Sequence, residues 1–116
     1  MKKIYTSYFA KYKGSQGISI ARSTPNWFIG RELKELAPPY DLVQRFKNGN
    51  IDERTFQEEY INRVLANVNP FKLARSLKDG DVLLCYEKTE SFCHRHILSE
   101  WLRQYGVEVE ELWNIE

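Results

Sequence analysis

A short apolar run, Val82–Tyr86, constrains the fold of this chain more than any other segment. It is bounded by turn residues at 79–81 and by a polar stretch, a pattern typical of a strand buried on both faces. The next segment, 91–105, has helical spacing, and Gly106 is a typical helix stop. A buried strand followed by a helix through a short link indicates a parallel crossover.

The rest of the chain continues this alternation. The patterns predict strands over 4–9, 17–22 and 107–110, and helices over 40–47, 52–68 and 71–78. Asp52 and Asn69 are expected to cap the second and third of these helices. Residues 26–37 are expected to form a loop and a short helix. We therefore predict an α/β fold, a small three-layer sandwich with a mostly parallel sheet of about four strands, Rossmann-like or flavodoxin-like, in a single domain over 1–116.

Composition limits the classes of function. A chain of 116 residues that is 42% apolar can bury a core, and its net charge of +1 gives no global attraction to nucleic acid or membrane. Its apolar stretches are too short for a membrane span or a signal peptide, so we expect a cytoplasmic protein without membrane partners. In that compartment the two cysteines are expected to be thiols. The basic residues gather in the first third, which could face an anion.

The candidate site lies where the buried strand ends and the following helix begins. Cys85 ends the strand, and Cys93, His94 and Arg95 start the helix. The free N–H groups of a helix start and a nearby arginine favour a thiolate, so Cys93 could be a nucleophile. His94 falls on the apolar face and should point to the carboxyl edge of the sheet, whereas His96 should be exposed on the opposite side.

The leading hypothesis is a binding site for a small anionic ligand, a nucleotide or a phosphorylated metabolite, at that edge of the sheet. Cys93, His94 and Glu87 are the expected catalytic residues, with Glu87 as a base or a partner for a hydroxyl group. The expected ligand-binding residues are Arg22, Arg95, Cys85, Thr6 and Ser7. Arg22 follows a strand and can bind a phosphate or carboxylate through two hydrogen bonds, although a surface salt bridge is an equal alternative.

Two other interpretations of the same cluster remain open. The residues could form an ordinary helix start, with a buried thiol, a histidine bonded to a carbonyl and a surface arginine. They could also bind zinc, but the spacing Cys-x7-Cys-His-x-His matches no usual zinc pattern, and the two histidines diverge on a regular helix. The sequence therefore predicts no metal.

The motifs Leu-Leu-Cys-Tyr-Glu-Lys (83–88) and Cys-His-Arg (93–95) resemble those of the domain of unknown function 488 family. The segments Arg22-Ser23-Thr24-Pro25 and 36–42 are similar to weaker motifs of that family. Ile20-Ala21-Arg22 stands where the family often has Asp-Val-Arg. The resemblance implies a small α/β sandwich, and no settled activity comes with it.

Two further functions remain open. A nucleic-acid-associated accessory protein without catalysis would use the basic, aromatic loop that contains Lys11, Tyr12 and Lys13. A partner-binding module would dock through Trp113 and Ile115.

Overall fold

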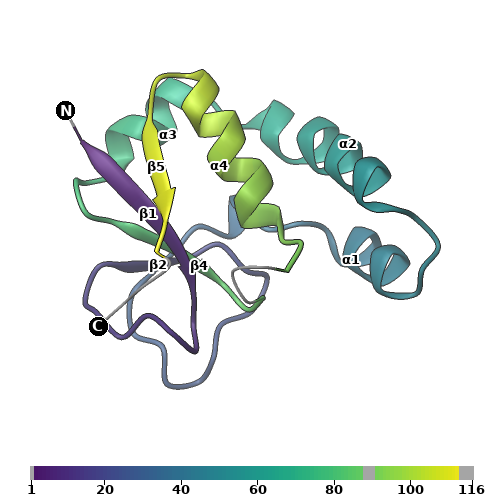
Figure 1. Cartoon of the computed structure of the whole chain (residues 1–116), viewed down its shortest axis with the longest axis horizontal. Coiled ribbons are helices and arrows are strands. Elements are labelled where there is room, and N and C mark those ends of the chain that lie inside the picture. The colour runs from purple at the N-terminus through teal and green to yellow at the C-terminus, as the bar shows by residue number, and fades with distance from the viewer. Residues whose placement is uncertain (1, 88–90, 113–116) are drawn as a thin grey trace.

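Five parallel strands form the central sheet of the fold, which the computed structural model describes for residues 2–87 and 91–112 (Figure 1). The predicted docking residues Trp113 and Ile115 lie outside these ranges. The strands are ordered β3-β2-β4-β1-β5 across the sheet. Their bounds are β1 (Lys3–Tyr8), β2 (Gly17–Ser19), β3 (Arg31–Glu32), β4 (Val82–Cys85) and β5 (Glu108–Glu111).

Four helices complete the fold and confirm the α/β prediction. They are α1 (Tyr40–Lys47), α2 (Glu53–Arg63), α3 (Pro70–Ser76) and α4 (His94–Gln104), with short 3-10 turns at Lys34–Leu36 and Leu65–Asn67. The Asp52 carboxylate accepts a hydrogen bond from the Thr55 amide at 2.9 Å, so the predicted cap of α2 is confirmed. No described helix has the length and apolarity needed to traverse a bilayer.

The strand β4 lies at the middle of the sheet, as its apolar sequence predicts. It pairs with β1 on one side and β2 on the other, and Cys85 is level with Tyr8 at the carboxyl edge. Leu83 and Cys85 contribute to the core beneath the helices, whereas Val82 and Leu84 face the opposite side. That second face packs against residues of the loops, among them Phe9, Tyr12, Ala21 and Phe28. The layer on that side therefore contains loop segments.

The structure corrects several predicted boundaries. β2 ends at Ser19, so residues 20–22 already run beyond the strand. The predicted helix 52–68 breaks after Arg63, where the chain tightens into a 3-10 turn. A fifth strand, β3, forms inside the segment expected to be a loop and short helix. It was missed because its two residues are both exposed and carry no apolar alternation.

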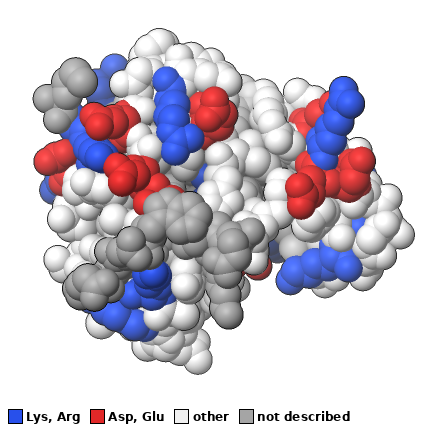
Figure 2. Space-filling view, in the orientation of Figure 1, with Lys and Arg blue, Asp and Glu red and all other residues white. Residues whose placement is uncertain are grey.

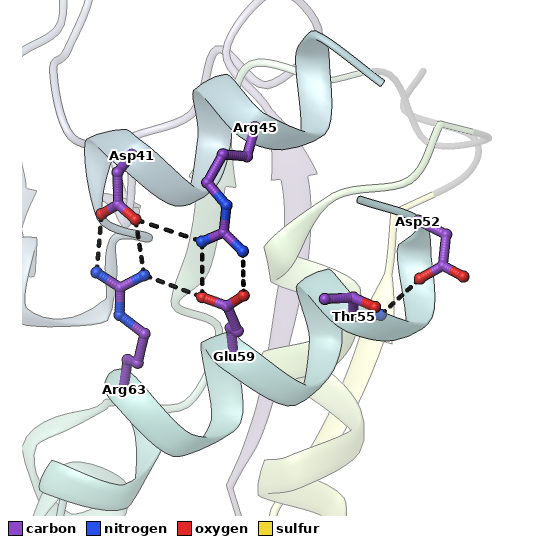
Figure 3. Close-up of polar contacts among 6 residues, drawn as sticks. All are labelled: Asp41, Arg45, Asp52, Thr55, Glu59 and Arg63. Atoms are coloured by element: carbon purple, nitrogen blue, oxygen red, sulfur yellow. Dashed lines mark hydrogen bonds and ion pairs between the residues drawn. The ribbon is translucent and has the colours of Figure 1, made fainter. Parts of the chain in front are cut away.

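Helices α1 and α2 are joined by a network of four charges (Figure 3). Arg63 binds both carboxylate oxygens of Asp41, at 2.8 and 2.9 Å, and Arg45 binds Glu59. The hydrogen bonds from Arg63 lower the pKa of Asp41 to about 2. Charged residues of α2 thus hold α1 in place.

Charges of both signs lie next to each other over the face shown in Figure 2. The parallel pairing of β1 with β5 brings Lys3 beside the acidic end of the chain, with its Nζ 2.6 Å from Glu110 Oε1. Part of the basic character of the amino-terminal third is therefore neutralised within the protein.

Candidate functional site

A cavity of about 340 Å³ opens at the carboxyl edge of the sheet. Three segments form most of its wall: the chain after β2, helix α1, and the connection from β4 to α4. Its lining consists of Ala21, Arg22, Ser23, Pro38, Val43, Phe46, Lys47, Phe56, Cys85, Tyr86, Glu87, Phe92, Cys93 and His94. Five of the predicted site residues are therefore brought together, namely Arg22, Cys85, Glu87, Cys93 and His94.

Thr6 and Ser7 do not reach this cavity. Both are buried within β1, which continues to Tyr8. The Thr6 hydroxyl donates a hydrogen bond to Glu111 Oε1 at 2.5 Å, and Ser7 is level with Leu84 rather than with the end of β4. These side chains lie short of the edge of the sheet because strands pair with β1 on both sides.

Arg95 also lies behind the cavity wall. Its side chain is fully buried and binds both carboxylate oxygens of Glu111, at 3.1 and 2.8 Å. Its Nη1 atom also donates to Cys85 Sγ at 2.8 Å and to the Glu87 carbonyl at 2.7 Å. The guanidinium therefore positions the end of β4 from within the protein. An arginine that binds a ligand would need to reach the surface of the cavity, and Arg95 does not.

His94 is the first residue of α4 and points to the edge of the sheet, where the sequence places it. Its Nε2 atom lies 2.8 Å from the Ile20 carbonyl oxygen. A carbonyl only accepts, so Nε2 carries the proton and Nδ1 has a free lone pair. Burial lowers the pKa of His94 to about 4, so the imidazole is neutral near pH 7. Its Nδ1 lies 3.7 Å from Cys93 Sγ.

The prediction that His96 is exposed is wrong. The residue is half-buried, and its Nε2 atom is buried. The reason is the wide buried arc of α4, which includes Arg95 and Ser99 as well as Ile97 and Leu98.

Cys85 and Cys93 form a disulfide pair, whereas the sequence predicts two thiols. Both side chains are buried, and their Cα atoms are 7.9 Å apart. Cys93 is the N-cap residue of α4, one position before the first helical turn in which the sequence places it. The two sulfurs and the His94 imidazole therefore form one cluster on the cavity wall.

The mouth of the cavity is cationic. Arg22 and Lys47 are both exposed, and neither forms an ion pair with an acidic residue in the described ranges 2–87 and 91–112. The Arg22 guanidinium lies 5.5 Å from the centre of the Tyr40 ring, which is itself exposed. Among the described residues, no acidic side chain therefore forms the surface salt bridge that was the alternative role of Arg22.

Sequence reasoning missed four contributors to this site. Phe46, Phe56 and Phe92 pack together as one aromatic wall, with ring centres 5.0–5.3 Å apart. Glu111 holds Arg95 from the last strand. The spacing of Phe46 and Phe56 on helices indicated core positions, whereas Glu111 carried no local signal.

A family model, DUF488-N3a, described as the active DUF488-N3 subclade, matches residues 12–106. Neither the comparison with curated proteins nor that with solved structures gives a match.

Proposed function

Since the chain belongs to the DUF488 family, for which the match names no substrate, we propose from the cavity itself that it binds a small anionic ligand, a nucleotide or a phosphorylated metabolite. We propose further that Cys93 and His94 act on this ligand. One observation carries the proposal: two exposed cations, Arg22 and Lys47, border a cavity whose wall contains a cysteine pair and a neutral imidazole.

The two sides of the cavity suit two parts of such a ligand. Arg22 can bind a phosphate through two parallel hydrogen bonds, and Lys47 adds a second positive charge. Phe46 and Phe92 offer an apolar aromatic surface on which a planar base can pack. A nucleotide combines an anion with a planar apolar face, so it satisfies both sides.

The polar groups near Cys93 can orient the reacting groups. When Cys93 is reduced, the Nδ1 lone pair of His94 can accept a hydrogen bond from its thiol, because Nε2 is already committed to Ile20. The carboxylate of Glu87 is exposed on the cavity wall, where it can accept a hydrogen bond from a ligand hydroxyl group. The free amides at the start of α4 add partial positive charge next to these groups.

The test is ligand binding by Arg22→Ala compared with wild type, with adenosine mono- and diphosphate, ribose phosphate and pyrophosphate as probes in calorimetry. We expect about a 10- to 100-fold loss of affinity, since a charge-assisted hydrogen bond contributes roughly 1.5–3 kcal/mol. Arg54→Ala is the matched control, because Arg54 is exposed on α2 outside the cavity lining. Equal affinities of Arg22→Ala and wild type would contradict the proposal.

A second candidate function is that of a nucleic-acid-associated accessory protein without catalysis. The observation that favours it is the pair Lys13–Trp27, in which Nζ lies 4.4 Å from the centre of a ring that is 56% exposed. Such a pair can stack on a base and bind a phosphate. Tyr12 is occupied within the loop, where its hydroxyl accepts a hydrogen bond from the Gln16 amide.

This function predicts oligonucleotide binding that weakens as the salt concentration rises and in the variants Lys11→Ala and Lys13→Ala. Affinity that ignores salt would contradict it.

A further inference from the structure

We propose that Cys85, Cys93 and His94, once a thiol reductant has opened the Cys85–Cys93 pair, bind one thiophilic divalent metal ion, with zinc as the best match to the donor set. Their donor atoms all lie within 4.8 Å of one another, and all three residues are buried. In a tetrahedral site with metal–sulfur bonds of about 2.3 Å and metal–nitrogen bonds of about 2.0–2.1 Å, neighbouring donors are about 3.5–3.8 Å apart.

The orientation of His94 is that of a metal ligand. Its Nε2–H group donates to the Ile20 carbonyl at 2.8 Å, which leaves Nδ1 as the donor atom for an ion. Metal-binding histidines usually make this type of second hydrogen bond, which fixes both tautomer and ring orientation. The separation of 3.7 Å between Nδ1 and Cys93 Sγ agrees with the spacing of two ligands on one ion.

The backbone spacing of the two cysteines also favours an ion between them. Their Cα atoms are 7.9 Å apart. Protein disulfides usually span about 4.4–6.8 Å between Cα atoms, and pairs beyond about 7 Å need a backbone movement to close. Two thiolates that share an ion need no sulfur–sulfur bond, so they tolerate this wider spacing.

The charges of the cluster balance for a divalent ion. Two thiolates and a neutral imidazole together neutralise a charge of plus two, which suits a buried position. Arg95 is paired with Glu111, so it adds no net charge, and its hydrogen bond to Cys85 Sγ orients that ligand. The ion would thus supply the positive charge that two thiolates buried side by side require.

The fourth coordination position would face the cavity, because all three residues line it. Three protein ligands and one open position are typical of catalytic zinc sites. The open position would hold water or an oxygen atom of the bound anion. The inference therefore deepens the proposed function, because Cys93 and His94 would act on the anion as ligands of the ion, and it rests on that function for the identity of the oxygen. The sequence spacing argued against a metal because the two histidines diverge, whereas the structure brings His94 together with both cysteines and leaves His96 out.

The test is a Co²⁺ titration of the full chain, reduced with a phosphine, stripped with a chelator and kept anaerobic. We expect saturation at a single equivalent, with a thiolate-to-cobalt charge-transfer band and the intense visible bands of tetrahedral cobalt, both abolished by Zn²⁺. Cys85→Ser, Cys93→Ser and His94→Gln should each weaken binding by more than about 100-fold, beyond the usual effect of losing a second-shell contact. His96→Gln is the matched control and should titrate like wild type.

Wild-type protein that gives no charge-transfer band, or a His94→Gln variant that binds cobalt as wild type does, would overturn the inference. Circular dichroism checks the fold of each variant, and if Cys85→Ser does not fold, Cys93→Ser and His94→Gln still decide. Arg22→Ala separates the two proposals, because it should lose anion affinity and retain cobalt binding. If His96→Gln lost as much cobalt affinity as His94→Gln, that result would also contradict the site.

Discussion

Arg95 donates a hydrogen bond to the sulfur of Cys85 across 2.8 Å from a fully buried position. Glu111 on β5 binds the same guanidinium through two oxygens, and Thr6 on β1 binds Glu111 in turn. One buried chain of contacts therefore connects the edge strand to the residue at the end of β4. Cys85 is held in place by side chains that never meet a ligand in the cavity.

Replacement of Arg95 by Met should destabilise the protein by about 3–5 kcal/mol, because the buried Glu111 carboxylate then loses the positive charge that balances it. Urea unfolding measures the change. The double variant Arg95→Met/Glu111→Leu should recover most of this loss, since it removes both charges together. Arg54→Ala is the control, because its ion pair with Glu58 is exposed. A double variant less stable than Arg95→Met would contradict this account.

Tyr60→Phe should lower stability by about 1–3 kcal/mol. The Tyr60 side chain is fully buried, and its hydroxyl donates to the Leu36 carbonyl at 2.6 Å. The variant leaves that carbonyl without its donor and changes the packing very little. Tyr105→Phe, at an exposed position, is the matched control in the same urea experiment. If the two variants unfold at the same urea concentration, the hydrogen bond does not contribute.

Asp41 should stabilise the protein only above the acid range. Its folded-state pKa of about 2 is below its ordinary value, so its stabilising contribution is present above about pH 4 and is lost as the pH falls toward 2. Thermal unfolding of wild type and Asp41→Asn should therefore differ at pH 7 and converge near pH 2. A difference that stays constant across this range would show that Asp41 acts through something other than its charge.

Lys47→Glu should weaken binding of an anionic probe such as pyrophosphate several-fold, with an unchanged melting temperature. The side chain is exposed and lines the cavity, so the reversed charge repels the anion without disturbing the core. Salt should reduce the difference between the variant and wild type, because exposed charges are screened. Lys72→Glu, on an exposed residue outside this cavity, is the matched charge reversal. Equal weakening by both variants would indicate a long-range field rather than a site.

Local patterns were enough to predict the elements that position the site. The apolar run at Val82 required a buried strand, and Asp52 and Asn69 had the side chains that helix starts need. Gly106, with a φ of 84°, ends α4 in a conformation that costs glycine least. His94 could be oriented because the helical period fixes its face relative to Ile97 and Leu98.

The parts that sequence reasoning missed depend on distant partners. From the sequence alone, Arg95 was expected to bind the ligand. In the structure it is paired with Glu111, sixteen positions later. Thr6 was expected to bind the ligand, but its hydroxyl bonds to Glu111, which comes 105 positions later in the chain. The meeting of Cys85 with Cys93, by contrast, was expected, because the end of a strand and the start of the following helix share one edge of the sheet.

The strand order also bears on how the protein is made. β1 pairs with β4 and β5, and β4 begins at Val82, so β1 leaves the ribosome well before the two strands that it pairs with. Such long-range pairing makes folding slow compared with that of proteins built from local contacts. The apolar residues of β1, with Ile4 fully buried in the native state, are exposed throughout that interval. Nascent chains that stop before β4 should therefore aggregate or depend on chaperones.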